Sequence, residues 1–375
     1  MPPKRAKRGA ARSAGCAAER SLADAGEAVE RLLIHLSLDE LALILFRLPL
    51  AHDIALTGLT CRLLRDAARL AFKARPYLGK LVSLHHTEKF LTSSAHRDDV
   101  MCVAAAADGR VITGSLDRSI KLWRGSACAR AMPSAHRAAI ASIAVLPGGA
   151  RFVSVGERTA KLWTLDGALE LIFNVGGHVF CVAALPDGVH FVVNAGFVVL
   201  LFHIDGTLVH TFKGHTLHVI AVAVTPDGQH IISSSPDRRV KVWSVASKSL
   251  VGDCIGHNGG VTAVAVMPDG KRILSGATDK TVRRWLLDGT QTDSFRLHTG
   301  TVRALVALPD NQHALSGSHD TTIKLFNAND GAVLRTFKHH TAPARSLALL
   351  PDGLRFASVS DDRTACIVEH GLAPH

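Results

Sequence analysis

The sequence has few aromatic residues and no long apolar run, and each shortage excludes a class of protein. Only 5 % of the 375 residues are aromatic, with one Tyr and four Trp. No stretch of 18 apolar residues occurs, and the charged N-terminus is not followed by an apolar segment. Neither a membrane span nor a secretion signal is therefore expected, which places the protein inside the cell, in the nucleus, the cytoplasm or both.

Cysteines are also few, and their spacing follows no ligand pattern. The chain has seven, with no C-x-x-C pair. An odd, scattered set fits reduced and buried thiols better than disulfides or zinc. Of the 21 histidines, the pairs His85-His86 and His339-His340 have no carboxylate or cysteine nearby at ligand spacing, so no metal site is expected.

Motifs that carry a catalytic mechanism are missing as well. The sequence has no G-x-x-x-x-G-K-[ST] phosphate loop, no G-x-S-x-G elbow and no H-E-x-x-H zinc motif. The sequence therefore predicts a non-enzymatic protein that needs no cofactor.

One stretch, residues 257–285, sets a pattern that the rest of the chain repeats. An apolar run leads to the turn Pro268-Asp269-Gly270, and a second run closes on Ser275, Asp279 and Trp285. Proline presets one turn dihedral and glycine accepts positive φ, so this stretch predicts short strands joined by tight turns. The turn recurs at steps of 39 to 42 residues as Ala107-Asp108-Gly109, Pro147-Gly148-Gly149, Pro186-Asp187-Gly188, Pro226-Asp227-Gly228, Pro309-Asp310-Asn311 and Pro351-Asp352-Gly353.

Four polar or aromatic residues keep their places around these turns. A histidine stands eleven residues before the turn, and Ser or Thr, Asp and Trp follow it. The sets are His96, Thr113, Asp117 and Trp123; His215, Ser233, Asp237 and Trp243; His257, Ser275, Asp279 and Trp285; His298, Ser316 and Asp320; and His340, Ser358 and Asp362. A His-Ser-Asp set resembles a catalytic triad, but its repetition along the chain predicts a structural role.

Two repeats depart from this pattern, and two others lack only the Trp. The second has His136 but carries Glu157 where Asp is expected. The third has Gly176 near the His position, Val193 for Ser and Phe202 for Trp. We expect the third repeat to be the loosest.

Seven copies at this period resemble the WD-repeat family, which implies an all-β, seven-bladed propeller over residues 89–370. No blade could bury its faces alone, so stability is expected to come from neighbours stacked in a closed ring. Residues 89–92 hold the place, just before His96, that residues 208–212 hold before His215. They are expected to complete the last blade and close the ring.

Residues 1–20 hold six basic residues and one Glu, so five of the chain's eleven formal net positive charges lie there. This composition predicts a disordered tail. Residues 4–8, Lys-Arg-Ala-Lys-Arg, resemble a nuclear-localisation signal; the alternative is a tail that only adds charge. Nucleic-acid binding is not expected, because basic and aromatic residues are not interleaved.

Residues 21–77 are expected to form three short helices, with residues 78–88 as a linker. Apolar residues follow helical spacing up to Pro49, after which a second helix is predicted. They are Leu38, Leu41, Ile44, Leu45, Leu48 and Ile54. This segment resembles an F-box, although it lacks the usual opening Pro and has Leu64 in place of an aromatic residue.

The F-box resemblance implies a partner and a function. These apolar residues would bind a Skp-type adaptor that joins a cullin, and the propeller would select proteins for an SCF-type E3 ubiquitin ligase. In the alternative, the helices only cap the propeller of a WD-repeat scaffold protein that has no ligase link and is nuclear.

The same resemblance implies where a substrate binds. We call each set of His, Ser or Thr, Asp and Trp described above a tetrad. In F-box/WD-repeat receptors the residue five positions after the tetrad His and the residue just before the tetrad Asp face the channel mouth. The first set is Met101, Ala141, Ile220, Thr262, Arg303 and Arg345, and the second is Leu116, Pro236, Thr278, His319 and Asp361. Arg303, His319 and Arg345 are expected to bind a phosphorylated or acidic peptide. The alternative is that Asp361 pairs with Arg345.

Overall fold

The computed structural model describes residues 88–89, 96–125 and 127–372, all within one compact unit that spans residues 85–375. The predicted tail at residues 1–20, the helical segment 21–77 with its adaptor-binding residues, linker residues 78–87 and the pair His85-His86 lie outside these residues. Within the described ranges, no helix is long and apolar enough to cross a membrane.

The described strands form seven antiparallel four-stranded sheets, numbered here as blades one to seven. Blade one contains β2 (Val100–Ala105), β3 (Val111–Ser115), β4 (Ile120–Arg124) and β5 (Ala127–Met132). Blade two contains β6 (Ser142–Val145), β7 (Arg151–Gly156), β8 (Thr159–Thr164) and β9 (Leu169–Asn174). Blade three contains β10 (Val182–Ala184), β11 (His190–Ala195), β12 (Val198–His203) and β13 (Leu208–Phe212).

The remaining four blades repeat this order. Blade four contains β14 (Ala221–Val224), β15 (His230–Ser234), β16 (Arg239–Ser244) and β17 (Leu250–Ile255). Blade five contains β18 (Val261–Val266), β19 (Arg272–Ala277), β20 (Val282–Leu286) and β21 (Gln291–Phe295). Blade six contains β22 (Val302–Ala307), β23 (His313–Ser318), β24 (Ile323–Asn327) and β25 (Val333–Phe337). Blade seven contains β26 (Ala344–Leu349), β27 (Arg355–Ser360), β28 (Ala365–Glu369) and β1 (Glu88–Lys89).

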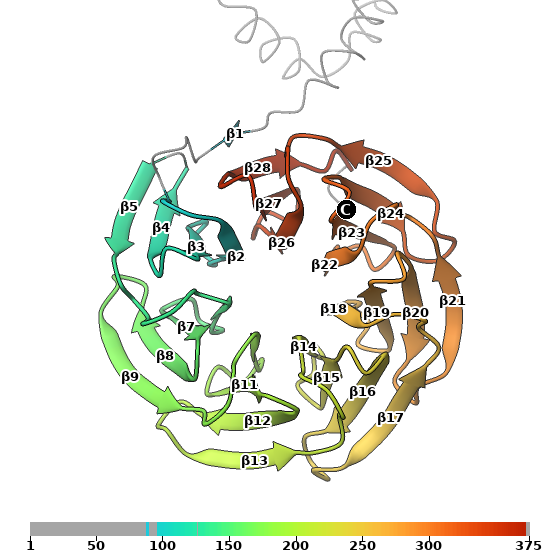
Figure 1. The fold of residues 1–375 in the computed structure, drawn as a ribbon, viewed down its shortest axis with the longest axis horizontal. Coiled ribbons are helices and arrows are strands. Elements are labelled where there is room, and N and C mark those ends of the chain that lie inside the picture. The colour runs from blue at the N-terminus through green and yellow to red at the C-terminus, as the bar shows by residue number, and fades with distance from the viewer. Residues whose placement is uncertain (1–87, 90–95, 126, 373–375) are drawn as a thin grey trace, which may run out of the picture. The chain divides into compact units, whose positions relative to one another are not determined.

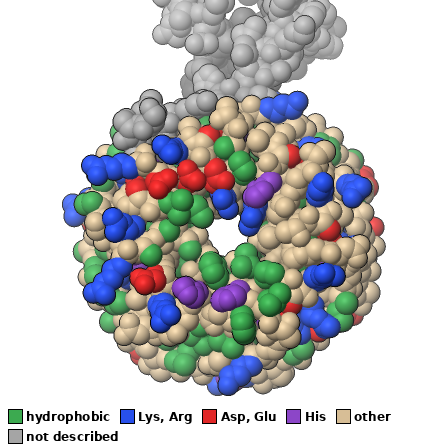
Figure 2. Space-filling model, viewed as in Figure 1, with side chains coloured by type: hydrophobic (Ala, Val, Ile, Leu, Met, Phe, Trp, Pro, Cys, Tyr) green, Lys and Arg blue, Asp and Glu red, His purple; other side chains and the backbone are tan. Residues whose placement is uncertain are grey.

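The seven blades are arranged in a ring around a central axis (Figure 1), and a channel opens at the centre of the ring (Figure 2). The first strand of each blade lies nearest the channel and the fourth lies at the rim. The seven-bladed, all-β architecture predicted from the repeat period is confirmed.

Ring closure is made by β1, which comes from the opposite end of the chain to its partners. It pairs antiparallel with β28, with Glu88 opposite Ile367 and Lys89 opposite Cys366. The predicted closing strand is confirmed at Lys89 and begins one residue earlier; residues 90–92 lie outside the described part. Blade seven therefore joins the two ends of the ring.

The core of the ring lies between blades rather than within them. Seven apolar clusters occur among the described residues, and each combines side chains of two neighbouring blades. One cluster joins Val100 of β2 to Val359 of β27 across the closure. A blade separated from its neighbours would expose both apolar faces, so the ring is stable only as a closed set.

The turn between the first and second strands uses residues that accept positive φ. Glycine takes this position in six blades, with φ between 67° and 82°. In blade six Asn311 has φ of 58°, a conformation that asparagine adopts more readily than most residues. The Asn thus explains why this copy of the turn works without Gly.

The repeated polar residues form a directed chain of hydrogen bonds in the interior. In blade five, His257 Nδ1 lies 2.9 Å from Asp279 Oδ2 and its Nε2 lies 2.7 Å from Ser275 Oγ. Trp285 Nε1 donates to the same hydroxyl at 2.7 Å. A carboxylate only accepts, so Nδ1 donates to Asp279 and the lone pair on Nε2 accepts from the Ser275 hydroxyl. Blades one and four have the same arrangement.

Blades two and three replace part of this network. In blade two, Thr159 Oγ1 lies 3.2 Å from His136 Nδ1, where blades one and four to seven have a carboxylate. In blade three, Asn194 Oδ1 accepts the backbone N–H groups of Phe180 and Cys181, at 2.7 and 3.0 Å. Phe191 and Phe202 stack with their ring centroids 5.7 Å apart. The looseness expected of blade three stays a prediction.

Removing the shared hydroxyl of one blade is expected to destabilise the whole ring. Ser275→Ala leaves two buried donor or acceptor atoms, on His257 and Trp285, without a partner. A loss of about 1–3 kcal/mol in the free energy of unfolding is expected, measured by chemical denaturation. The exposed Ser247→Ala is the control, and equal effects of the two variants would contradict this account.

Acid is expected to destabilise the protein through blade two, whose tetrad His has no carboxylate partner. Burial, and then the nearby Lys161, lowers the pKa of His136 to about 4, against about 6.5 in an unfolded chain. Between these values the unfolded state binds more protons, so stability falls as pH drops from about 6.5 to about 4. Thermal unfolding across this range should show a shallower pH dependence for His136→Gln than for the unchanged protein. An identical dependence would show that His136 is not responsible.

Candidate protein-binding face

Two kinds of loop from every blade lie on one face of the ring, around the channel opening. Strands alternate in direction within a blade, so the loop that enters the first strand and the turn between the second and third strands lie on the same side. These connections carry the tetrad His and Asp residues. We call this side the mouth face.

All six residues of the first set predicted to face the channel mouth line the channel, whereas the five residues of the second set are not among the lining residues. The six are Met101, Ala141, Ile220, Thr262, Arg303 and Arg345. Figure 2 shows the opening, with basic side chains and a His at the rim near β22 and β26, and hydrophobic side chains on the opposite rim near β11 and β14. The structure thus brings the two predicted arginines to one side of the opening; their role in binding stays a prediction.

The basic side of the mouth face contains two hydrogen-bonded pairs of side chains, one on blade six and one on blade seven. Arg303 Nε donates to His319 Nε2 at 3.0 Å, and Arg345 Nε donates to Asp361 Oδ1 at 2.5 Å. The Arg345 and Asp361 side chains are 27 % and 17 % exposed. The pairing of Arg345 with Asp361, the alternative given above, is therefore present, and Arg345 is not an isolated cation.

The four side chains leave one uncompensated positive charge. Burial, then the charges of Arg303 and Arg345, lowers the pKa of His319 from its usual 6.5, so this ring is neutral at pH 7. Burial and the neighbouring Arg345 also lower the pKa of Arg303, which starts from 12.5 and stays protonated. Since Asp361 neutralises Arg345, Arg303 is the cation that a carboxylate or phosphate would meet.

An aromatic patch on blades three and four lies on the same face. Phe180, Phe197 and Leu217 are 39 %, 47 % and 46 % exposed. The ring of His218 lies edge-to-face with both phenylalanines, at centroid distances of 5.7 Å from Phe180 and 4.9 Å from Phe197. Phe180 also lines the channel. Large apolar side chains grouped on a rim are typical of a surface that another molecule covers.

The sequence contained a signal for this patch, but channel positions were assigned by counting five residues forward from each tetrad His. Blade three lacks the tetrad His, so no channel residue was assigned to it. Phe180 stands six residues before Pro186, just as Arg345 stands six before Pro351. Counting back from the turn instead of forward from the His identifies Phe180.

The tetrad histidines lie too deep to contact a substrate. His96, His215, His257, His298 and His340 are between 1 % and 7 % exposed, and both ring nitrogens of each lie within hydrogen-bond distance of side chains in their own blade. This placement is that of scaffolding residues.

The structure brings together one group of side chains that spacing along the sequence did not connect. The pair His339-His340 does have a convergent cysteine: one ring nitrogen of each and Cys366 Sγ all lie within 4.8 Å of one another. Cys366 stands 26 residues further along the chain, on β28, and strand pairing brings it back. Spacing rules for metal ligands do not detect a partner that arrives through sheet pairing.

Comparison with known proteins supports the repeat assignment. The model of the "WD domain, G-beta repeat" family matches residues 87–124, 206–244, 248–285, 289–327 and 331–369, together more than half of the chain. The first match begins beside β1 in blade seven and ends in blade one, so each sequence repeat straddles two blades. The two departing repeats fall between the first and second matches.

Curated relatives share the repeats over part of their length. "U3 small nucleolar RNA-associated protein 15 homolog" of Gallus gallus is 25 % identical over 191 residues, which cover 50 % of this chain and 29 % of that protein. "Transcription initiation factor TFIID subunit 5" of Caenorhabditis elegans is 26 % identical over 171 residues, 42 % of this chain and 25 % of that protein. "WD repeat-containing protein 18" of Homo sapiens is 27 % identical over 189 residues, 42 % and 43 % respectively. The chain thus spans less than half the length of each.

The electrostatic coupling on the mouth face is testable without a ligand. Asp361→Asn removes the charge that raises the pKa of His319, so that pKa should fall further. Arg303→Gln removes a charge that lowers it, so the pKa should rise. NMR titration of the His319 ring checks both directions; shifts of the same sign in the two variants would contradict the arrangement.

Proposed function

The chain belongs to the WD-repeat family, and we propose that it is a non-catalytic scaffold protein that holds a segment of a partner protein on its mouth face within a larger assembly. The observation that carries this proposal is that the mouth face has both a cationic site on blade six and, across the channel, an exposed aromatic patch on blades three and four. A surface of this kind binds a partner segment and fixes its orientation, and these residues include no activated nucleophile.

The two sites define the chemistry of the partner segment. The guanidinium of Arg303 has one N–H engaged by His319, and the outer nitrogens of its fork suit the paired oxygens of a carboxylate or phosphate. Phe180 and Phe197 suit an apolar or aromatic side chain, which would remove exposed ring surface from water. The proposed ligand is therefore a peptide that carries an acidic or phosphorylated residue and an apolar anchor.

The names of the relatives support membership of an assembly. Two are named as a nucleolar-RNA-associated protein and as a subunit of a transcription factor complex. A nuclear location follows as part of the proposal, and the basic run at residues 4–8 supplies a signal for it.

A second candidate function is the SCF-type substrate receptor. It is favoured by the F-box-like pattern of Leu38, Leu41, Ile44, Leu45, Leu48 and Ile54 ahead of a WD-repeat ring. The relatives' names contain no reference to ubiquitin or to an F-box. We therefore place the scaffold function first, with the Skp-type adaptor and cullin as partners only under the second candidate.

The mouth-face proposal predicts that both sites contribute to peptide binding. On an array of peptides that combine acidic or phosphorylated residues with aromatic ones, Arg303→Glu and Phe197→Ala should each weaken binding by about tenfold or more, as loss of an anchor does. Leu250→Ala is the matched control, because Leu250 is 45 % exposed but lies at the opposite end of its blade. Binding that survives both mouth-face variants would remove the proposal.

A separate experiment separates the two candidate functions. The tagged full chain is purified from cells beside a Leu41→Asp, Ile44→Asp variant. The scaffold function predicts that the mouth-face partners are recovered equally with both forms. Recovery of a Skp-type adaptor and a cullin that is lost with the variant would instead establish the receptor function.

A further inference from the structure

Blade seven differs from the other blades at three positions that surround one buried hydroxyl, Ser358. Val368 stands where four blades have Trp. His339, just before the tetrad His, stands where blades four and five have Gly214 and Gly256. Cys366 stands where blades one, two, four, five and six have Lys121, Lys161, Lys241, Arg283 and Lys324.

Two of these differences compensate each other. In blades four and five the glycine lies against the indole: a Cβ at Gly214 would be 3.0 Å from the Trp243 ring, and one at Gly256 would be 3.2 Å from the Trp285 ring. With Val368 in place of the indole, blade seven has room for His339. Its Nε2 lies 2.9 Å from Ser358 Oγ, where the indole N–H donates in the four blades that have Trp.

The third difference, Cys366 in place of Lys or Arg, is not explained by the exchange of Gly and Trp for His339 and Val368. In blades two and six the lysine reaches the carbonyl just before the tetrad His, with Lys161 Nζ 2.6 Å from Ala135 O and Lys324 Nζ 2.6 Å from Leu297 O. Cys366 cannot make this contact. It is fully buried and sits directly opposite Ser358 in the sheet, so its thiol points to the same side as that hydroxyl.

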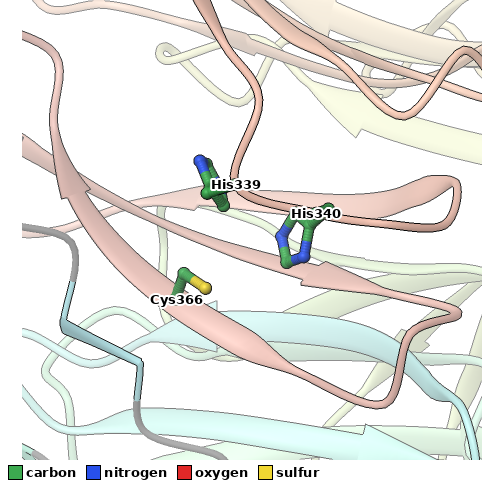
Figure 3. A group of neighbouring side chains, drawn as sticks. All are labelled: His339, His340 and Cys366. Carbon is green, nitrogen blue, oxygen red and sulfur yellow. The ribbon is translucent and has the colours of Figure 1, made fainter.

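The result is a set of three metal-binding side chains around one point. One ring nitrogen of His339, one of His340 and Cys366 Sγ lie within 4.8 Å of one another. Figure 3 shows the two histidines on the loop ahead of β26 and Cys366 on β28. Both Nε2 atoms lie 2.9 Å from Ser358 Oγ, which places them on the same side of the cluster.

The surroundings of His340 complete the resemblance to a metal ligand. Its Nδ1 lies 3.0 Å from Asp362 Oδ2, so the Nδ1 proton is held by a carboxylate and the lone pair is on Nε2. A carboxylate behind the ligating His fixes the tautomer and ring orientation in zinc sites. His339 is half-buried whereas His340 and Cys366 are buried, which gives a cation one side from which to enter.

From this geometry we propose that His339, His340 and Cys366 bind a single zinc ion in blade seven. Thiolate and imidazole ligands select zinc over Mg²⁺ and Ca²⁺, and three protein ligands with a fourth position for water or Ser358 complete a tetrahedral sphere. Bonds of about 2.0–2.3 Å require the three donor atoms to move together by roughly an ångström. Cys366 loses its proton to solvent on binding, so affinity rises with pH.

The bound ion would brace the blade that closes the ring. It would tie the loop ahead of β26 to β28, the strand on which β1 pairs. Because a native-state ligand stabilises a fold by mass action, zinc should raise the melting temperature of the protein.

The test uses the metal-free full chain titrated with Co²⁺ as a spectroscopic substitute for zinc. The unchanged protein should show a thiolate-to-cobalt charge-transfer band and tetrahedral d–d bands at one equivalent, displaced by zinc. Cys366→Ser should abolish the charge-transfer band. His339→Gly, which restores the residue of blades four and five, should weaken binding by more than the roughly 10- to 100-fold cost of losing an outer-shell partner.

The control variant is Cys254→Ser, which removes another buried cysteine, on β17, and should leave the spectrum unchanged. Circular dichroism confirms that each variant is folded, and the His339→Gly result stands even if Cys366→Ser fails to fold. No charge-transfer band in the unchanged protein, or a band that persists in both cluster variants, would overturn the proposal. A band lost in Cys254→Ser would assign the metal to a different cysteine.

Discussion

Apolar packing between neighbouring blades is the interaction on which the rest of this structure depends. Every apolar cluster of the described residues contains side chains of two adjacent blades. A sheet that is apolar on both faces needs two neighbours, and only a closed ring gives each blade two. The closure at blade seven, made by the apolar contacts of blade seven with blade one and by the pairing of β1 with β28, is therefore a condition for the whole fold rather than a local detail.

The polar tetrads fix how neighbouring strands are aligned within a blade. A stack of apolar sheets alone would allow neighbouring strands to slide, whereas a buried Asp-His-Ser-Trp chain has one arrangement that satisfies all its donors and acceptors. Each chain runs from the loop that enters a blade to the turn between its second and third strands. It thereby fixes the two connections that form the mouth face in the blades that have it, and with them the position of Arg303 in blade six.

The sequence predicted the fold well because the features that determine it are local and repeated. The turns at Pro268-Asp269-Gly270 and its copies, the tetrads and the closing position of Lys89 each follow from spacing along the chain. The channel-lining positions followed from the same count, and Arg303 and Arg345 lie where it placed them.

What the sequence did not predict depends on contacts between distant segments. The His218 ring between Phe180 and Phe197 joins two blades, and the blade that supplies the phenylalanines lacks the His from which positions were counted. Cys366 joins His339 and His340 only through pairing of β28 with β27. That Asp361 neutralises Arg345 was foreseen as an alternative, but choosing it required the 2.5 Å distance between them.

The most direct test of the central claim compares the thermal unfolding of two shortened chains. One begins at residue 85 and keeps β1, and the other begins at residue 96 and lacks it. If inter-blade packing depends on closure, the chain without β1 should lose cooperative unfolding or melt many degrees lower, with the loss spread over all blades. Equal melting of the two chains would contradict the account, because the stability of the ring would then not depend on its closure by β1.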